Sequence, residues 1–401
     1  MAPKKMKITD LYIYPIKSLC PLSVRKTRLR REGLQYDRRF MLLKVLPDGG
    51  YKNIQTVYFP ECTLFDQTIQ GDGEGGLDVV VTYRIPEKPL VNPPPPEQST
   101  ALRVPLNPTF DGLDTVDIEL FGSPTFAYRM GDSYDAWFSS CLGYPAVLVY
   151  IGENRRPVLA HSPPTPAPLS QSNSWLSSIT SYIPYWSRAA QPDAKETNDG
   201  GLAFNEAAPF LVTSKASLRE VSTRLPSDQP MNMIKFRPNI VVDEVSDDDT
   251  NDNDSDYYSI DEEPSEEQGE AKGEENALKA YDEDHWAELR IRRRHRLALT
   301  ANCARCASIN IDYSTGRPGT NESGSVLKKL MKDRRVDTGN KWSPIFGRYA
   351  FLLPPTSPPP EHSGDEGEDG DGEDWVADVA VGDEVEVTKR NTERDVWAWP
   401  K

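Results

Sequence analysis

Short β-patterned runs, each closed by a turn signal, recur along most of this sequence and limit the folds that it can adopt. One run ends at Pro15, and another, at 39–45, ends at the turn Pro47-Asp48-Gly49-Gly50. Further runs follow at 77–85, 115–120, 125–129 and 146–151. Many short strands with few helices between them predict a strand-dominated, barrel-like α+β fold rather than a series of βαβ units.

Three segments carry helical signals. Asp132 or Ser133 can cap the first helix, which Gly143 ends, and Ser214 can cap the second, which Pro226 ends. The third is a short basic helix that contains Leu327, Leu330 and Met331. We expect further strands at 236–242, 289–291, 297–300 and 307–311, and a last strand that alternates Val381, Val385 and Val387.

Acidic residues are concentrated in two runs that cannot belong to a core. Residues 243–275 hold sixteen Asp and Glu against one Lys, and residues 361–374 hold eight acids and no base. Like charges at this density repel one another and favour solvated, disordered segments. Without these runs, whose net charges are −15 and −8, the chain's −16 becomes about +7. The mildly basic remainder suits a small anionic ligand better than nucleic acid.

Residues 161–200 are rich in Pro, Ser, Thr and Ala and predict a linker or insert. Between Trp175 and Trp186, apolar residues follow the spacing of one helical face. A membrane-surface helix would show this spacing. The segment carries little basic charge, however, so packing against its own domain is the favoured interpretation.

The five cysteines are too few, in 401 residues, for a disulfide framework. The sequence after Met1 has no apolar signal region, and no stretch approaches 18 apolar residues. We therefore expect an intracellular protein, cytoplasmic by default.

The motif Cys303-Ala304-Arg305-Cys306 has several interpretations. A structural zinc site needs four ligands, and the sequence has no second cysteine pair. A thioredoxin-type redox pair needs a helix N-terminus, whereas this motif stands between two β-patterned runs. Two small buried thiols are the third interpretation. Arg305 beside Cys306 would favour a thiolate, which is the form that binds a soft metal.

Cations and small hydroxyl donors also stand at the ends of predicted strands, where a phosphate-bearing ligand requires them. The segments are Tyr14-Pro15-Ile16-Lys17-Ser18, Asp37-Arg38-Arg39 and Phe236-Arg237-Pro238-Asn239. Any one of these cations alone is more often a surface or turn residue, so their combination carries the argument.

Together and in this order, these segments resemble the MOSC family, named for the C-terminal domain of molybdenum cofactor sulfurases. The β-rich domain that precedes MOSC in many members is similar to ITDLYIYPIKSLCPLSVRKTRLRREGLQYDRRFML. The MOSC pattern is matched in order by FNEAAPFLVTSKASLREV, IKFRPNIVV, YDEDHWAELRI, CARCASINIDYSTG, IFGRYAFLL and VAVGDEVEV. The chain is similar to mitochondrial amidoxime-reducing components and to bacterial two-domain MOSC proteins.

The resemblance implies a β-rich N-terminal domain at residues 6–150 packed on a MOSC β-barrel at 201–388. A Pro/Ser-rich linker or insert would occupy 151–200, and disordered acidic and Pro-rich inserts would lie at about 243–277 and 355–376. The molybdenum cofactor (Mo-molybdopterin) would be held between the two domains.

The resemblance also implies site residues. Cys306 would coordinate molybdenum and act as the catalytic thiolate. The cofactor would be bound by Lys17, Ser18, Arg38, Ser214, Arg237, Asn239 and Arg305. Ser214 can also be only the helix cap, a role compatible with anion binding at that helix end. Asp312 matches a family acid near the metal, although an acid entering a turn is commonly a turn residue.

The implied activity is the reduction of small N-hydroxylated compounds, such as amidoximes and hydroxylamines, because the cofactor carries two-electron and oxygen-atom chemistry. Electrons would come from a separate protein, such as a b-type cytochrome with its flavin reductase. The relatives also make a mitochondrial association conceivable. Two alternatives stay open: a non-catalytic carrier of the cofactor or of sulfur, and a scaffold whose acidic loops recruit partners.

Overall fold

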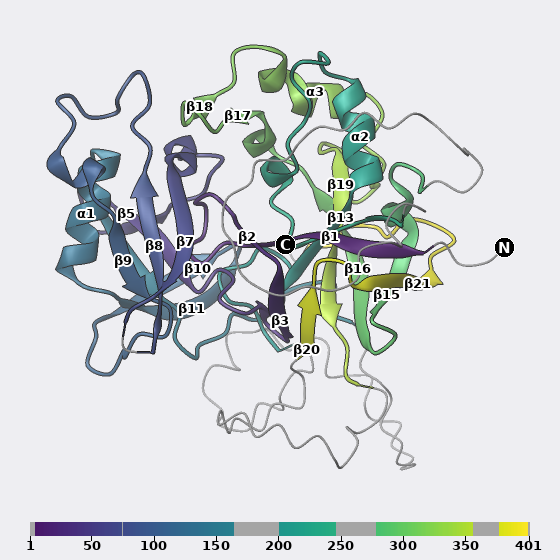
Figure 1. Cartoon of the computed structure of the whole chain (residues 1–401), viewed down its shortest axis with the longest axis horizontal. Helices are drawn as coiled ribbons and strands as arrows, with labels where there is room; N and C mark the ends of the chain where they lie inside the picture. The colour runs from purple at the N-terminus through teal and green to yellow at the C-terminus, as the bar shows by residue number, and fades with distance from the viewer. Residues whose placement is uncertain (1–4, 74, 164–199, 246–277, 356–376, 400–401) are drawn as a thin grey trace.

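The computed structural model describes residues 5–73, 75–163, 200–245, 278–355 and 377–399. Strands dominate these residues and form a closed barrel beside a second β-rich unit, on the right and left of Figure 1. The predicted strand-dominated α+β class is therefore confirmed. The Trp175–Trp186 segment lies outside the described residues, as do most of the two acidic runs.

Seven strands close the barrel, in the order β14–β13–β19–β16–β15–β21–β1, with β1 returning to β14. Only the β13–β14 pair is parallel among these seven described strands. The strands are β1 (Met6–Ile13), β13 (Phe210–Ser214), β14 (Ile240–Glu244), β15 (Trp286–Ile291), β16 (His295–Ala304), β19 (Ile345–Leu352) and β21 (Glu384–Arg390). The first strand of the chain thus closes a barrel whose other strands come from residues 210–390.

The barrel core is apolar. Leu11, Phe210, Trp286 and Leu297 are at most 1% exposed and belong to one buried cluster. Burial of an aliphatic or Phe side chain contributes about 1.5–3 kcal/mol. This packing fixes the strand ends on which the pocket described below is built.

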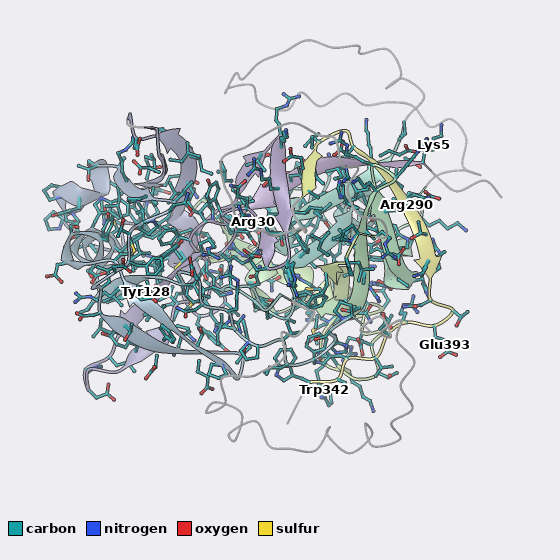
Figure 2. The ribbon with its side chains drawn as sticks, turned by 90° about the horizontal axis from the view of Figure 1, so that it is seen from below. Lys5, Arg30, Tyr128, Arg290, Trp342 and Glu393 are labelled. Carbon is teal, nitrogen blue, oxygen red and sulfur yellow. The ribbon has the colours of Figure 1, made fainter. Side chains whose placement is uncertain are left out.

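The second unit packs two antiparallel sheets and one helix around another apolar cluster. Its five-stranded sheet has the order β10–β11–β12–β5–β6, and its three-stranded sheet the order β7–β8–β9. These strands are β5 (Phe40–Val45), β6 (Tyr51–Asn53), β7 (Phe65–Gly71), β8 (Leu77–Tyr83), β9 (Leu102–Pro105), β10 (Thr115–Leu120), β11 (Ser123–Arg129) and β12 (Ala146–Tyr150). In Figure 2, Tyr128 marks this unit, and Arg290 marks the barrel.

Helix α1 (Asp132–Leu142) covers the second unit and buries Trp137 and Phe138 against Phe65. Gly143, in the left-handed conformation with φ 76°, ends this helix as predicted. The N-cap is Gly131 rather than Asp132 or Ser133, and no side chain caps this end. The other α-helices are α2 (Lys215–Thr223) and α3 (Val326–Leu330).

Smaller elements complete the fold. The remaining strands are β2 (Leu22–Val24), β3 (Lys26–Arg30), β4 (Gly33–Leu34), β17 (Ile311–Asp312), β18 (Arg317–Pro318) and β20 (Ala377–Ala380). The 3-10 helices are η1 (Pro60–Leu64), η2 (Pro96–Ser99), η5 (Met233–Phe236), η7 (Asp282–His285), η8 (Ala307–Asn310) and η9 (Glu322–Ser325). None of the helices that the structure describes is long and apolar enough to cross a membrane.

Two predicted strands are partly wrong. Within 236–242, β14 begins only at Ile240, because Arg237 is left-handed (φ 55°) and Pro238 has no N–H for strand pairing. Residues 307–310 form η8 instead of a strand, and Ile309 is buried from this helix. The basic run at residues 290–296 spans the turn between β15 and β16.

Candidate functional site

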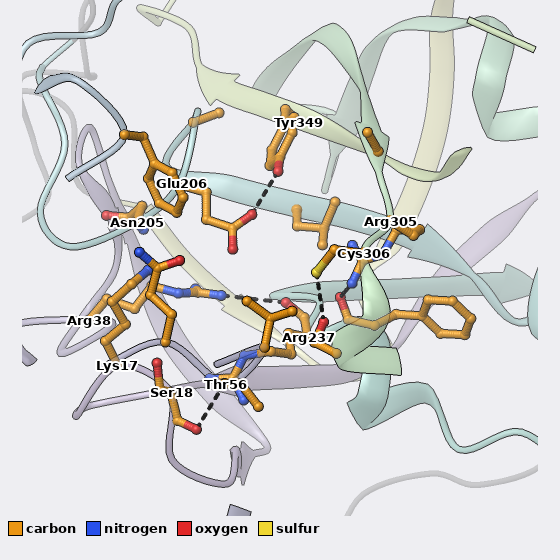
Figure 3. Close-up of a pocket in the computed structure, with 18 of the residues that line it drawn as sticks. Lys17, Ser18, Arg38, Thr56, Asn205, Glu206, Arg237, Arg305, Cys306 and Tyr349 are labelled. Atoms are coloured by element: carbon orange, nitrogen blue, oxygen red, sulfur yellow. Dashed lines mark hydrogen bonds between the residues drawn. The ribbon is translucent and has the colours of Figure 1, made fainter. Parts of the chain in front are cut away.

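A pocket of about 290 Å³ lies where loops of the second unit meet the ends of barrel strands (Figure 3). Seven of the eight site residues expected from the sequence line it: Lys17, Ser18, Arg38, Arg237, Asn239, Arg305 and Cys306. These residues are up to 289 positions apart in the sequence (17 to 306) and come together through the closure of the barrel by β1.

Ser214 is the expected site residue that does not line this pocket. Its buried hydroxyl accepts a hydrogen bond from the Ser217 N–H (3.1 Å) and contacts the Glu283 carboxyl group at 3.0 Å. Ser214 therefore has the role of helix cap for α2. Asp312 also lies outside the pocket lining, and its carboxylate accepts hydrogen bonds from Ser314 within a turn.

Lys17 and Ser18 enter the pocket from the loop that follows β1. The Lys17 ammonium donates a hydrogen bond to the Phe204 carbonyl (2.8 Å) and lies 5.4 Å from the centroid of the Phe121 ring. Burial lowers the pKa of Lys17 to about 7. An anion bound beside this amine would restore its charge.

Arg38 is held by a buried polar network. Its guanidinium donates to the Asp37 carboxylate (2.5 Å) and to the Asn239 side-chain oxygen (3.3 Å). Asp37 also accepts hydrogen bonds from the Tyr14 N–H and from the Asn205 and Asn239 amides. Since a buried ion pair needs such additional donors to offset its desolvation, this network fixes Arg38 at the pocket wall.

Arg237 and Asn239 are positioned by the turn that delays β14. Asn239 accepts a hydrogen bond from the Leu211 N–H (3.2 Å) and so ties this turn to β13. Arg237 donates to the Leu19 carbonyl (3.0 Å), and its guanidinium lies 4.3 Å from the Tyr14 ring centroid. Arg38 lies 4.5 Å from the same ring. Tyr14 thereby orders two cations through cation–π contacts.

The two cysteines of the Cys-x-x-Cys motif differ in environment. Cys303 is 1% exposed at the end of β16, whereas Cys306 is exposed, lines the pocket and lies 3.2 Å from the Ser308 hydroxyl. Arg305 donates a hydrogen bond to the Cys303 sulfur (2.8 Å). Burial raises the pKa of the Cys303 thiol.

The positions of Cys303 and Cys306 exclude one of the three interpretations of the motif. The motif does not consist of two buried thiols, because Cys306 is exposed. All five cysteines are free. The described residues contain no group of three or more His, Cys, Asp or Glu side chains placed to hold a metal ion.

Glu206 and Tyr349 also line the pocket, although the sequence did not single them out. The Tyr349 hydroxyl donates to the Glu206 carboxylate at 2.9 Å. Desolvation in the pocket raises the pKa of Glu206, but Lys17, Arg305 and Tyr349 outweigh this effect and hold the pKa below its usual value. Both residues lie in segments quoted for the resemblance, FNEAAPF and IFGRYAFLL, but nothing in their spacing indicated a shared pocket.

The chemistry of the pocket is that of an anion site with one soft ligand. Four basic side chains (Lys17, Arg38, Arg237 and Arg305) line it together with one carboxylate. The buried Arg305 Nε has no hydrogen-bond partner among the described residues. An anionic, phosphate-bearing ligand would satisfy such donors, and the Cys306 sulfur suits a soft metal.

Fold and pocket thus define a two-unit β protein with a basic pocket beside an exposed thiol. Two protein-family models match the chain: the "MOSC N-terminal beta barrel domain" matches residues 5–145, and the "MOSC domain" matches residues 199–266 and 272–386. The chain belongs to the MOSC-domain family.

Curated relatives fall into two groups. The chain is 25% identical over 350 residues to mitochondrial amidoxime-reducing component 1 of Danio rerio, which covers 85% of this chain and 79% of that protein. It is 24% identical over 366 residues to the molybdenum cofactor sulfurase of Neosartorya fischeri, which covers 86% of this chain but 37% of that protein. The chain therefore spans most of the first relative and little more than a third of the second.

Proposed function

We propose that this protein is a molybdenum-cofactor oxidoreductase that reduces N-hydroxylated compounds, such as amidoximes and hydroxylamines, to the parent nitrogen compounds and water. The observation that carries the proposal is Cys306, the exposed one of the five cysteines, which lines a pocket with four basic side chains. The similarity to amidoxime-reducing components over 85% of the chain supports it.

The residues present fit the cofactor. We propose that Lys17, Ser18 and Arg38 bind its phosphate and pterin from one side and Arg237, Asn239 and Arg305 from the other, while the Cys306 thiolate ligates the metal. Guanidinium forks match phosphate oxygens, and Arg305 retains a buried donor without an acceptor among the described residues. When bound, the cofactor supplies two-electron and oxygen-atom chemistry.

The reaction consumes two electrons and two protons for each N–OH group. We propose that the electrons come from a separate redox protein, such as a small b-type cytochrome with its flavin reductase. The part of this chain is then to hold the cofactor and to orient the substrate nitrogen in the pocket.

A second candidate is a non-catalytic carrier of the molybdenum cofactor or of sulfur. The sulfurase relatives favour it, because they match at an identity similar to that of the reductase relatives. An exposed Cys306 would serve both functions. Turnover of an N-hydroxylated substrate separates the two.

The test uses protein made in a host that synthesises molybdopterin, with Cys306→Ser compared against Cys303→Ser. We expect about one molybdenum per chain in the wild type and in Cys303→Ser, and disrupted metal coordination in Cys306→Ser. We also expect reduction of benzamidoxime with a reduced artificial donor. Cofactor without turnover would favour the carrier. Well-folded protein with neither pterin nor molybdenum would exclude both the reductase and a carrier of the molybdenum cofactor, and would leave only the sulfur carrier.

A further inference from the structure

Glu206 is the one acidic side chain among the described residues that line the pocket. Figure 3 shows its carboxylate directed into the space between Lys17 and Arg38 on one side and Cys306 on the other. One of its oxygens accepts the hydrogen bond from Tyr349 (2.9 Å). A carboxylate in a pocket suited to anions requires a physical explanation.

The backbone of this segment is held rigidly. Arg156 is 1% exposed, and its guanidinium donates to the carbonyls of Ala203 (2.8 Å), Asn205 and Leu120 (2.8 Å). Two backbone hydrogen bonds between Arg156 and Leu202 hold the same segment at the residue before Ala203. These backbone contacts and the Tyr349 hydrogen bond preorganise the Glu206 carboxylate, as a group that determines specificity requires.

The charges around Glu206 change when an anion binds. In the free pocket Lys17, Arg305 and Arg38 compensate the carboxylate. An anion that pairs with these cations leaves Glu206 to be balanced by a proton or by a second cation. The Tyr349 hydroxyl donates to the carboxylate, and a donor to the charged form disfavours protonation.

On this basis, and resting on the proposed function, we propose that the Glu206 carboxylate, held by Tyr349, accepts hydrogen bonds from the amidine or guanidine N–H groups of substrates and pairs with the cationic amidinium or guanidinium group of their reduced products. Planar cations pair with a carboxylate through two hydrogen bonds. Phe121 and Tyr58 (68% exposed) add aromatic surface to the pocket for a flat, conjugated substituent. Glu206 would thus favour N-hydroxylated amidines and guanidines, which carry an NH2 donor beside the N–OH group, over hydroxylamines, which lack this donor.

The test measures binding of benzamidinium to the cofactor-loaded protein by calorimetry, without turnover. We expect Glu206→Gln to weaken binding about tenfold or more, which corresponds to at least about 1.4 kcal/mol. Neutral benzamide should bind both proteins alike. Glu119→Gln, an exposed acid on β10, is the matched control and should leave benzamidinium binding unchanged.

Tyr349→Phe tests the positioning role. Without the phenol donor the pKa of Glu206 should rise, so benzamidinium binding should be lost at a higher pH than in the wild type. A loss of packing alone would not move this pH profile. Equal benzamidinium affinity in wild type and Glu206→Gln would overturn the inference. If Glu206→Gln weakens benzamidinium binding as expected, but the wild-type protein does not reduce benzamidoxime, the inference stands and the proposed function is contradicted.

Discussion

Lys17 is buried beside the pocket, with the pKa of its amine lowered to about 7 by burial. Between pH 7 and the ordinary pKa of 10.5, the unfolded chain binds a proton that the folded chain does not. The cost of burying Lys17 is therefore fully present below pH 7 and is relieved as the pH rises from 7 to 10.5. Burial of Lys17 therefore reduces stability, and a role in binding an anion would explain its position at the pocket.

We predict that anion binding to the cofactor-free protein strengthens as the pH falls through 7. Inorganic sulfate is a suitable probe because it stays a dianion, and calorimetry at pH 6 and 8 gives its affinity. Lys17→Met should weaken sulfate binding and remove this pH dependence, whereas Lys328→Met, on the surface of α3, should not. A wild-type affinity that is equal at both pH values would contradict the charge state assigned to Lys17.

Several site residues could be predicted one by one, but their partners could not. Lys17, Arg38 and Cys306 stand in recognisable segments of the sequence, and the structure places all three at one pocket. The sequence placed Arg305 beside Cys306, yet its side chain contacts Cys303. Adjacent residues on an extended chain point in opposite directions, so proximity in sequence was a poor guide to this contact.

At the scale of elements, the C-terminal segment Asn391–Trp399 packs behind the pocket. Asp395 pairs with the buried Arg348 and accepts through its carbonyl from Asn302 (2.8 Å). Trp397 stacks on His161 with ring centroids 4.9 Å apart and lies 6.1 Å from the Tyr349 ring. The segment therefore supports the β19 residue that donates to Glu206.

We predict that Trp397→Ala destabilises the protein by roughly 1–2 kcal/mol, because it removes aromatic packing from a partly buried site. Urea unfolding measures this change. Trp342→Ala is the matched control, since Trp342 is 80% exposed (Figure 2) and should change stability little. Comparable losses in both variants would show that the C-terminal segment does not support the barrel.

Element types followed from local patterns except where the backbone turns sharply. Gly143 and Pro226 marked helix ends correctly to within a few residues. The delayed start of β14 depends on a left-handed Arg237, which the sequence does not reveal because arginine rarely adopts that conformation. That same turn brings Arg237 and Asn239 to the pocket, so the least predictable backbone is part of the site.

For the whole molecule, the closure of the barrel by β1 is the feature that joins the two units. Pairing between residues 6–13 and residues 240–244 and 384–385 is non-local, and no local pattern specifies it. The chain then passes from β1 into the second unit, where Ile16 and Leu19 belong to another buried cluster. One continuous segment is thus anchored in both cores and carries Lys17 and Ser18 between them.

We predict from this arrangement that the two units unfold as one. Leu11 is fully buried in the barrel, so Leu11→Ala should destabilise it by about 2–5 kcal/mol, whereas Leu77→Ala, at a 41% exposed position, should have little effect. Because the segment after β1 places Ile16 and Leu19 in the core of the second unit, loss of the barrel also removes support from that unit. Trp137 lies in the second unit and Trp286 in the barrel. Single-tryptophan variants that report these two sites should show coincident urea transitions, both shifted by Leu11→Ala. Two separate transitions, with only the Trp286 signal shifted, would mean that the units are independent and that the pocket does not link their stabilities.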